Sequence, residues 1–172
     1  EGLTGDRPES YRHFMEEHLF RHLDLRPDST HVPDGVAADQ ARACAAYEEA
    51  IRAAGGLDLQ VLGIGRTGHI GFNEPPSSAA SRTRRVHLDD VTRRDNAMFF
   101  ARAEDVPHGA ITMGVGTIME ARQVELLAFG AAKAGIIRRT IGESPHADCP
   151  ATWLQLHPAC TFHLDPAADT QP

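Results

Sequence analysis

His69 and Glu74, a histidine and a carboxylate five residues apart, are the residues whose types and spacing best fit proton-transfer chemistry. They share a glycine-rich stretch with Asn73. An imidazole exchanges protons near neutral pH, and a nearby carboxylate can orient the ring and favour its charged form. One histidine among ten would ordinarily be a surface or structural residue. This pair, placed in a turn after a buried apolar run, instead predicts a general acid–base site.

The same stretch contains a literal G-x-G-x-x-G pattern over 63–68, and Asp89 and Asp90 follow at about the spacing of a ribose-binding acid. A dinucleotide site also requires a helix to begin at the loop, so that its N-terminal dipole meets the pyrophosphate. Here the chain continues into Pro75 and Pro76, and consecutive prolines disfavour a helix. The sequence therefore argues against a nicotinamide site.

Lys133 is the single lysine beside sixteen arginines. It falls in the first turn of a predicted helix, just after Gly130, where unpaired backbone N–H groups and the helix dipole favour an anion. A flexible ammonium adds a charge-assisted contact. The alternative is a solvated surface lysine. The position at a helix start favours a phosphate ligand.

Alternating helix and strand patterns must position these residues. Helices are predicted over 8–26, 36–54, 92–101, 117–121 and 131–141, and strands over 59–64, 84–88, 110–113, 124–129 and 160–164. This alternation predicts an α/β fold, a three-layer Rossmann-like arrangement with a mostly parallel sheet. Ligands bind beyond the carboxyl ends of such strands, so the loops after Ile64, Met113 and Phe129 are expected to form the site.

The 172 residues fit one domain. A net charge of -7 argues against nucleic acid and anionic membranes as partners, because both need a basic surface. No apolar run approaches the roughly 18 residues of a membrane span, and the N-terminus lacks a signal-peptide pattern. We therefore expect a soluble, cytoplasmic protein. The three cysteines form no C-x-x-C pair and are expected to be reduced.

Residues 62–75, LGIGRTGHIGFNEP, closely resemble the signature loop of the glucosamine-6-phosphate deaminases, also called isomerases. The similarity continues through 8–11, 81–84, 110–117, 130–133 and 154–158 and covers nearly the whole chain. The related 6-phosphogluconolactonases share the Gly-His core but usually lack the Phe-Asn-Glu-Pro continuation. The resemblance implies that an amino sugar phosphate is converted to fructose 6-phosphate and ammonia, without a metal or an organic cofactor.

The resemblance also implies roles for individual residues. His69, supported by Glu74, would relay the proton for ring opening. Lys133 would bind the substrate phosphate, and Gly65 and Gly68 are further expected substrate- or phosphate-binding residues. A second pair, Ser77 and Arg84, matches two residues of an allosteric amino-sugar-phosphate site in the family. A lysine of that allosteric site is replaced by Val86.

Two substitutions depart from the family pattern. Thr67 stands where the deaminases usually have an aspartate, and a threonine can donate a hydrogen bond but cannot carry a negative charge. Met98 stands where a phosphate-binding arginine commonly lies. Arg93 and Arg94, one helical turn earlier, are the residues that could replace it.

The chain begins at Glu1, just after the place where the family has Asp-Glu-Tyr, whose aspartate is the base that removes the C2 proton. We therefore expect 1–172 to be the C-terminal two-thirds of one deaminase-like domain, with the N-terminal strands missing and weak or no activity alone. The open alternatives are a non-catalytic protein that binds or senses a sugar phosphate and, less favoured, a lactonase-type hydrolase. The family includes monomers and symmetric oligomers, so a homo-oligomer is one of the expected states.

Overall fold

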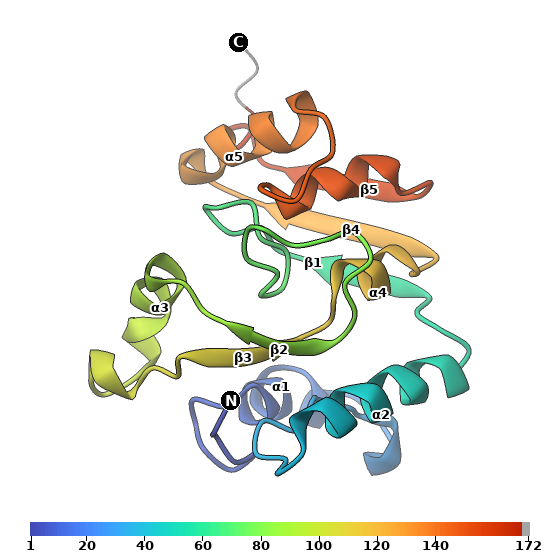
Figure 1. Ribbon diagram of the computed structural model, residues 1–172, viewed down its shortest axis with the longest axis vertical. Coiled ribbons are helices and arrows are strands. Elements are labelled where there is room, and N and C mark those ends of the chain that lie inside the picture. Colours follow the sequence, from blue (N-terminus) through green and yellow to red (C-terminus); the bar gives the residue numbers. More distant parts are fainter. Residues whose placement is uncertain (170–172) are drawn as a thin grey trace.

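The computed structural model describes residues 1–169 and places a three-stranded parallel sheet beside a two-stranded ribbon and several helices (Figure 1). The parallel sheet has the order β1 (Leu59–Leu62), β4 (Gln123–Ala128) and β5 (Cys160–Leu164). In its register, Leu62 lies opposite Leu126, and Leu126 lies opposite Phe162. The prediction of an α/β fold with a parallel sheet is confirmed.

The strands predicted over 84–88 and 110–113 do not extend this sheet. They form β2 (Arg84–His87) and β3 (Gly109–Thr112), which pair antiparallel with each other, Arg84 opposite Thr112. Figure 1 shows this ribbon between the parallel sheet and the two N-terminal helices. The sequence pattern did not predict this separate ribbon, because alternation along a strand does not specify its partner.

The α-helices are α1 (Tyr11–His18), α2 (Gln40–Ala53), α3 (Asp90–Asn96), α4 (Val115–Met119) and α5 (Ala131–Gly142). The 3₁₀ helices are η1 (Phe20–His22), η2 (Pro27–Ser29), η3 (Ala97–Phe99), η4 (Ala103–Asp105) and η5 (Pro150–Leu156). None of the helices in the described part of the chain is long and apolar enough to span a membrane.

Capping side chains set helix boundaries that differ from the predicted ones. Asp39 accepts a hydrogen bond from the backbone N–H of Arg42, 2.9 Å, so α2 begins at Gln40 and not at residue 36. Asp89 caps α3 in the same way, so α3 begins before Thr92 and ends at Asn96. The helix predicted over 8–26 is a capped α1 followed by short 3₁₀ turns, and η5 was not predicted.

The core lies between the parallel sheet and the helices beside it. It consists of Leu62, Ile64, Ile70, Ile118, Ala121, Val124, Leu126, Ala128, Ile136, Ile137, Cys149, Ala151 and Leu154. β4, the central strand, supplies fully buried Val124 and Leu126. All three cysteines are free thiols, as expected from their spacing.

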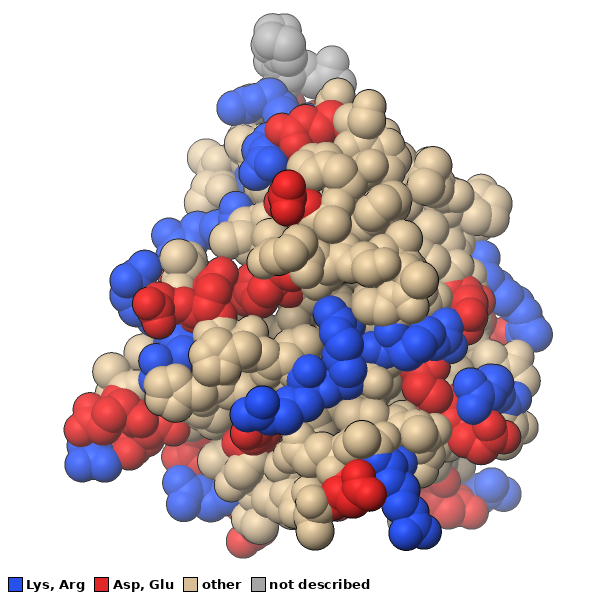
Figure 2. Space-filling view, in the orientation of Figure 1, with Lys and Arg blue, Asp and Glu red and all other residues tan. Residues whose placement is uncertain are grey.

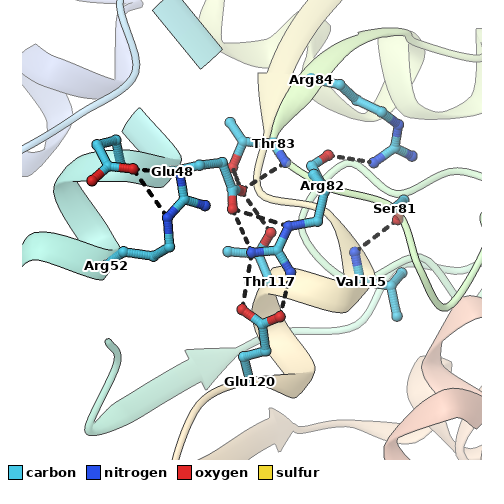
Figure 3. Close-up of polar contacts among 10 residues, drawn as sticks. Glu48, Arg52, Ser81, Arg82, Thr83, Arg84, Val115, Thr117 and Glu120 are labelled. Carbon is cyan, nitrogen blue, oxygen red and sulfur yellow. Dashed lines mark hydrogen bonds and ion pairs between the residues drawn. The ribbon is translucent and has the colours of Figure 1, made fainter. Parts of the chain in front are cut away.

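A buried carboxylate, Glu48 of α2, ties that helix to the segment before β2 and to α4 (Figure 3). One oxygen accepts hydrogen bonds from the backbone N–H of Thr83, 2.8 Å, and from the hydroxyls of Thr83 and Thr117. The other oxygen pairs with Arg82, 2.6 Å, which also pairs with Glu120. On the face that Figure 2 shows, acidic side chains flank the basic ones near the centre.

Candidate active site

The loop after β1 holds the predicted histidine in place by its backbone. The N–H of Gly65 donates to the carbonyl of His69, 2.9 Å, and the N–H of Gly68 donates to the carbonyl of Gly65, 3.0 Å. The ring of His69 lies against Gly65 so closely that a Cβ there would collide with it. Gly68 has a φ of +83°, and a Cβ at this position would meet the sulfur of Cys149. Both glycines are therefore required by the geometry of the loop.

His69, Glu74 and Thr67 form a compact polar cluster. Nδ1 of His69 lies 3.0 Å from Oε2 of Glu74, and the hydroxyl of Thr67 lies 3.1 Å from Nδ1 and 3.3 Å from the same carboxylate oxygen. The side chains of His69 and Glu74 are 17% and 10% exposed. This is the arrangement that the sequence spacing predicts. It can exchange a proton at the other ring nitrogen, Nε2, of His69.

The structure adds Thr92 to this cluster, a residue to which the sequence assigned no role at the site. Its buried hydroxyl donates to Oε1 of Glu74, so the two carboxylate oxygens are held by different partners. Thr92 belongs to the first turn of α3, whose N-cap is Asp89. An Asp-x-x-Thr pattern at the start of a helix indicates a cap, but only the fold brings the cap next to Glu74.

Asn73 connects the same loop to β2 and β3. Its side-chain amide, fully buried, donates to the carbonyls of Ile70 and Met113, both 2.8 Å. Its carbonyl oxygen accepts from Arg84, 2.8 Å. The residue preceding Glu74 is therefore fixed from three directions, which fixes the carboxylate that follows it.

Lys133 lies in the first turn of α5, after Gly130 in a left-handed conformation with φ of +87°. Its ammonium donates to the carbonyl of Ile64, 2.7 Å, which holds the start of α5 against the loop that follows β1. The N–H of Gly130 is itself bonded to a carboxylate oxygen of Asp165, 2.9 Å. Lys133 therefore sits beside the histidine loop although 64 residues separate it from His69 in the chain.

A cavity of about 1060 Å³ opens over these groups. His69, Gly65, Thr92 and Lys133 line it, and so does Arg66, which forms a bidentate ion pair with Asp95 of α3. Sequence reasoning missed Arg66 because an arginine within a glycine pattern carries no signal of its own. Among residues 1–169, no group of three or more His, Cys, Asp and Glu side chains is arranged to hold a metal ion.

The remaining residues predicted from the sequence are the Ser77–Arg84 pair, Met98 and the two arginines before it. Ser77 and Arg84 are hydrogen-bonded to each other, 3.2 Å, and burial lowers the pKa of the Arg84 guanidinium. Met98 is 80% exposed on η3. Arg93, one of the two arginines expected to replace a phosphate ligand at Met98, donates to the carbonyl of Val106, 3.2 Å, and Arg94 is exposed.

Comparison with known proteins identifies the family. The family model described as glucosamine-6-phosphate isomerases/6-phosphogluconolactonase matches residues 3–162. The chain belongs to this family. A family member from Shewanella loihica, a glucosamine-6-phosphate deaminase, is 53% identical over 97% of the chain, and one from Arthrobacter sp. strain FB24 is 52% identical over the same share. The chain spans 62% and 64% of the lengths of these two relatives.

Solved structures agree with this family membership. The structure of a monomeric glucosamine-6-phosphate deaminase matches with a TM-score of 0.94 and 41% identity, covering 97% of this chain and 69% of that protein. The 6-phosphogluconolactonase of Trypanosoma cruzi matches with a TM-score of 0.73 and 22% identity, covering 96% and 67%. At that identity, the second match shows a shared fold only.

Proposed function

We propose that this chain carries the sugar-phosphate site of a glucosamine-6-phosphate deaminase. The reaction consumes an amino sugar 6-phosphate and water and yields a ketose phosphate, fructose 6-phosphate, and ammonia. The observation that carries the proposal is the His69–Glu74 pair, because its histidine lines the same cavity as Lys133. The deaminase names of the relatives at 52–53% identity support the same substrate class.

The histidine pair suits the first step, the opening of the sugar ring. Ring opening removes a proton from the C1 hydroxyl and delivers one to the ring oxygen, so one group must act as both base and acid. Because Nδ1 of His69 is bonded to Glu74, Nε2 is the ring atom that exchanges protons with the sugar. Glu74 stabilises the imidazolium that forms while the proton is held.

The later steps move the C2 proton to C1 and hydrolyse the resulting imine, which releases ammonia at C2. The family resemblance assigns the C2 proton to the aspartate of an Asp-Glu-Tyr segment, which is not part of this sequence. Activity is therefore expected from a protein extended at its N-terminus to the length of the deaminase relatives, here called the extended protein.

Lys133 is proposed to bind the phosphate of the sugar. An ammonium has three N–H donors, and the bond to the carbonyl of Ile64 aims the group at the cavity while leaving donors for phosphate oxygens. The backbone N–H groups of Gly65 and Gly68 bond within the loop, so we assign them to shaping the site beside the sugar. Replacing the ammonium removes a charge-assisted hydrogen bond, for which about 1.5–3 kcal/mol is typical.

The test measures ammonia and fructose 6-phosphate formed from glucosamine 6-phosphate by the extended protein. Lys133→Ala should weaken binding of the sugar phosphate by roughly 10- to 100-fold, from that energy, with thermal unfolding unchanged. Lys133→Arg, which retains a cation, is the matched control and should lose less affinity. Sugar-phosphate binding without any ammonia or ketose would refute the deaminase and favour the non-catalytic alternative. Hydrolysis of 6-phosphogluconolactone in place of deamination would favour the lactonase alternative.

The pair Ser77 and Arg84 is proposed as part of a regulatory amino-sugar-phosphate site. The three acceptors bonded to the guanidinium are the uncharged oxygens of Asn73, Ser77 and the Arg82 backbone, so its positive charge is available to an anion. Arg84→Gln in the Lys133→Ala background should abolish residual binding of glucosamine 6-phosphate, measured by calorimetry. Unchanged residual binding would remove this pair from the proposal.

A cytoplasmic location and a homo-oligomeric state are further proposals. Sedimentation analysis tests the oligomeric state.

A further inference from the structure

Asp89 lies closer to the proposed proton relay than its place in the sequence suggests. As the N-cap of α3, it accepts a hydrogen bond from the backbone N–H of Thr92, 2.6 Å. The hydroxyl of the same threonine donates to Oε1 of Glu74. Because the N and Oγ1 atoms of one threonine are close neighbours, a carboxylate on each of them must lie beside the other. Asp89 and Glu74 are therefore adjacent, although 15 residues separate them in the chain.

The electrostatic setting of Asp89 agrees with this geometry. Burial raises the pKa of its carboxyl. Hydrogen bonds involving Thr92 and Glu74 and the charge of His69 lower that pKa by more, so it lies below its ordinary value. Asp89 is therefore ionised at neutral pH.

Other charged groups near Asp89 are directed elsewhere. Arg93, one turn further along α3, donates to the carbonyl of Val106, and Arg66 pairs with Asp95. Among the groups that act on Asp89, His69 is the cationic one and Glu74 the acidic one. The negative charge of Asp89 therefore acts on the N-terminus of α3 and on the nearby His69.

We propose that Asp89 is a positioning residue of the relay, which holds Glu74 against His69 through Thr92 and supplies the negative charge that Thr67 cannot. This inference rests on the proposed function and deepens it. The family pattern places that charge on an aspartate two residues before the histidine, and in this chain α3 brings it from the other side of Glu74. Asp89 then replaces the negative charge that is lost at position 67, where the family aspartate is a threonine.

The variants separate charge from capping. Asparagine caps a helix about as well as aspartate, so Asp89→Asn removes the charge and retains α3, and Asp89→Ser is a second capping variant should the first fail to fold. Thr92→Val removes the hydroxyl that links the two carboxylates. Asp39→Asn makes the same chemical change at the N-cap of α2 and is the matched control.

The first readout needs no catalytic activity. The ring resonances of His69 are followed by NMR against pH in this chain and assigned with His69→Gln. In Asp89→Asn the titration midpoint should fall by about 0.5–1 pH unit, as expected when a charge several ångströms away is removed, and it should stay at the parent value in Asp39→Asn. An unchanged midpoint in folded Asp89→Asn or Asp89→Ser would overturn the inference.

The second readout is the pH profile of deamination by the extended protein. Asp89→Asn should move the profile to lower pH and reduce kcat by about tenfold with little change in KM, since positioning of a general acid–base is lost and phosphate binding is not. A parent profile retained by Asp89→Asn would refute the inference and leave the deaminase standing. A shifted His69 midpoint with no deamination by the extended parent would refute the proposed function and uphold the link between Asp89 and His69.

Discussion

Replacing Glu48 by glutamine tests how much the buried network of Figure 3 contributes to the fold. The side chain is 7% exposed and spans three elements, because it binds Thr83 and Arg82 before β2 and Thr117 in α4. Glutamine has nearly the same shape but no charge, and its amide presents donors to groups that also donate. The substitution therefore removes the acceptor on which the network depends.

The magnitude follows from the ionisation of the carboxyl. Burial raises the pKa of Glu48, but hydrogen bonds from Thr117, Thr83 and Arg82 outweigh it and lower the pKa from 4.5 to about 2. At about 1.4 kcal/mol per pH unit, this difference contributes on the order of 3 kcal/mol to the free energy of unfolding. Since the folded-state pKa is the lower one, the contribution is present above pH 4.5 and is lost as the pH falls towards about 2.

The assay is urea unfolding followed by the fluorescence of Trp153, the single tryptophan, at a series of pH values. At pH 7, Glu48→Gln should be less stable than the parent by about 3 kcal/mol, and the difference should shrink between pH 4.5 and about 2. Glu49→Gln, at an exposed ion pair with Arg52, is the control and should change stability by less than about 0.5 kcal/mol. A Glu48→Gln protein as stable as this control at pH 7, or a deficit independent of pH, would refute the reasoning.

Two further substitutions test the loop that carries the relay. Gly65→Ala should place its methyl group against the ring of His69 and lower deamination by the extended protein by about 100-fold, whereas Gly63→Ala, whose Cβ would meet no atom within 4 Å, should retain it. Equal rates for the two variants would contradict the close fit at Gly65. Asn73→Ala should lower the free energy of unfolding by about 2–4 kcal/mol in urea, because it removes three hydrogen bonds of a fully buried side chain, to the carbonyls of Ile70 and Met113 and from Arg84. A loss under about 1 kcal/mol would show that water replaces the amide.

Local patterns were sufficient to predict the groups that lie within one loop or one turn. His69 and Glu74 are five residues apart, and the glycines around them permit a tight turn, so the spacing alone predicts their contact. Lys133 was predicted at a helix start from Gly130 alone. In each case the predicted feature, the His69–Glu74 contact or the helix start at Lys133, depends on neighbouring residues, for which spacing is a reliable guide. The contact of Lys133 with Ile64 is not of this kind.

Contacts between distant segments could not be predicted in this way. The strand pattern of 84–88 describes a half-exposed strand, but pairing with β3 and not with the parallel sheet depends on hydrogen-bond partners in another part of the chain. The predicted helix over 92–101 missed the cap at Asp89, and no local pattern shows that the capped turn lies against Glu74.

These two misses account for the incomplete view of the site that the sequence provides. β2 carries the chain from Arg84, which is anchored at Asn73, to the capped start of α3, which returns to Glu74. The loop between Glu74 and Thr92 is thus bonded to the relay at both ends, and Glu48 anchors it near its middle through Thr83. The sequence shows one histidine and one carboxylate. In the structure, the chain segment that follows Glu74 leaves the relay and returns to it at Thr92, and both of its ends support the relay. Substitutions at such anchors should therefore affect the chemistry although none of them contacts the sugar.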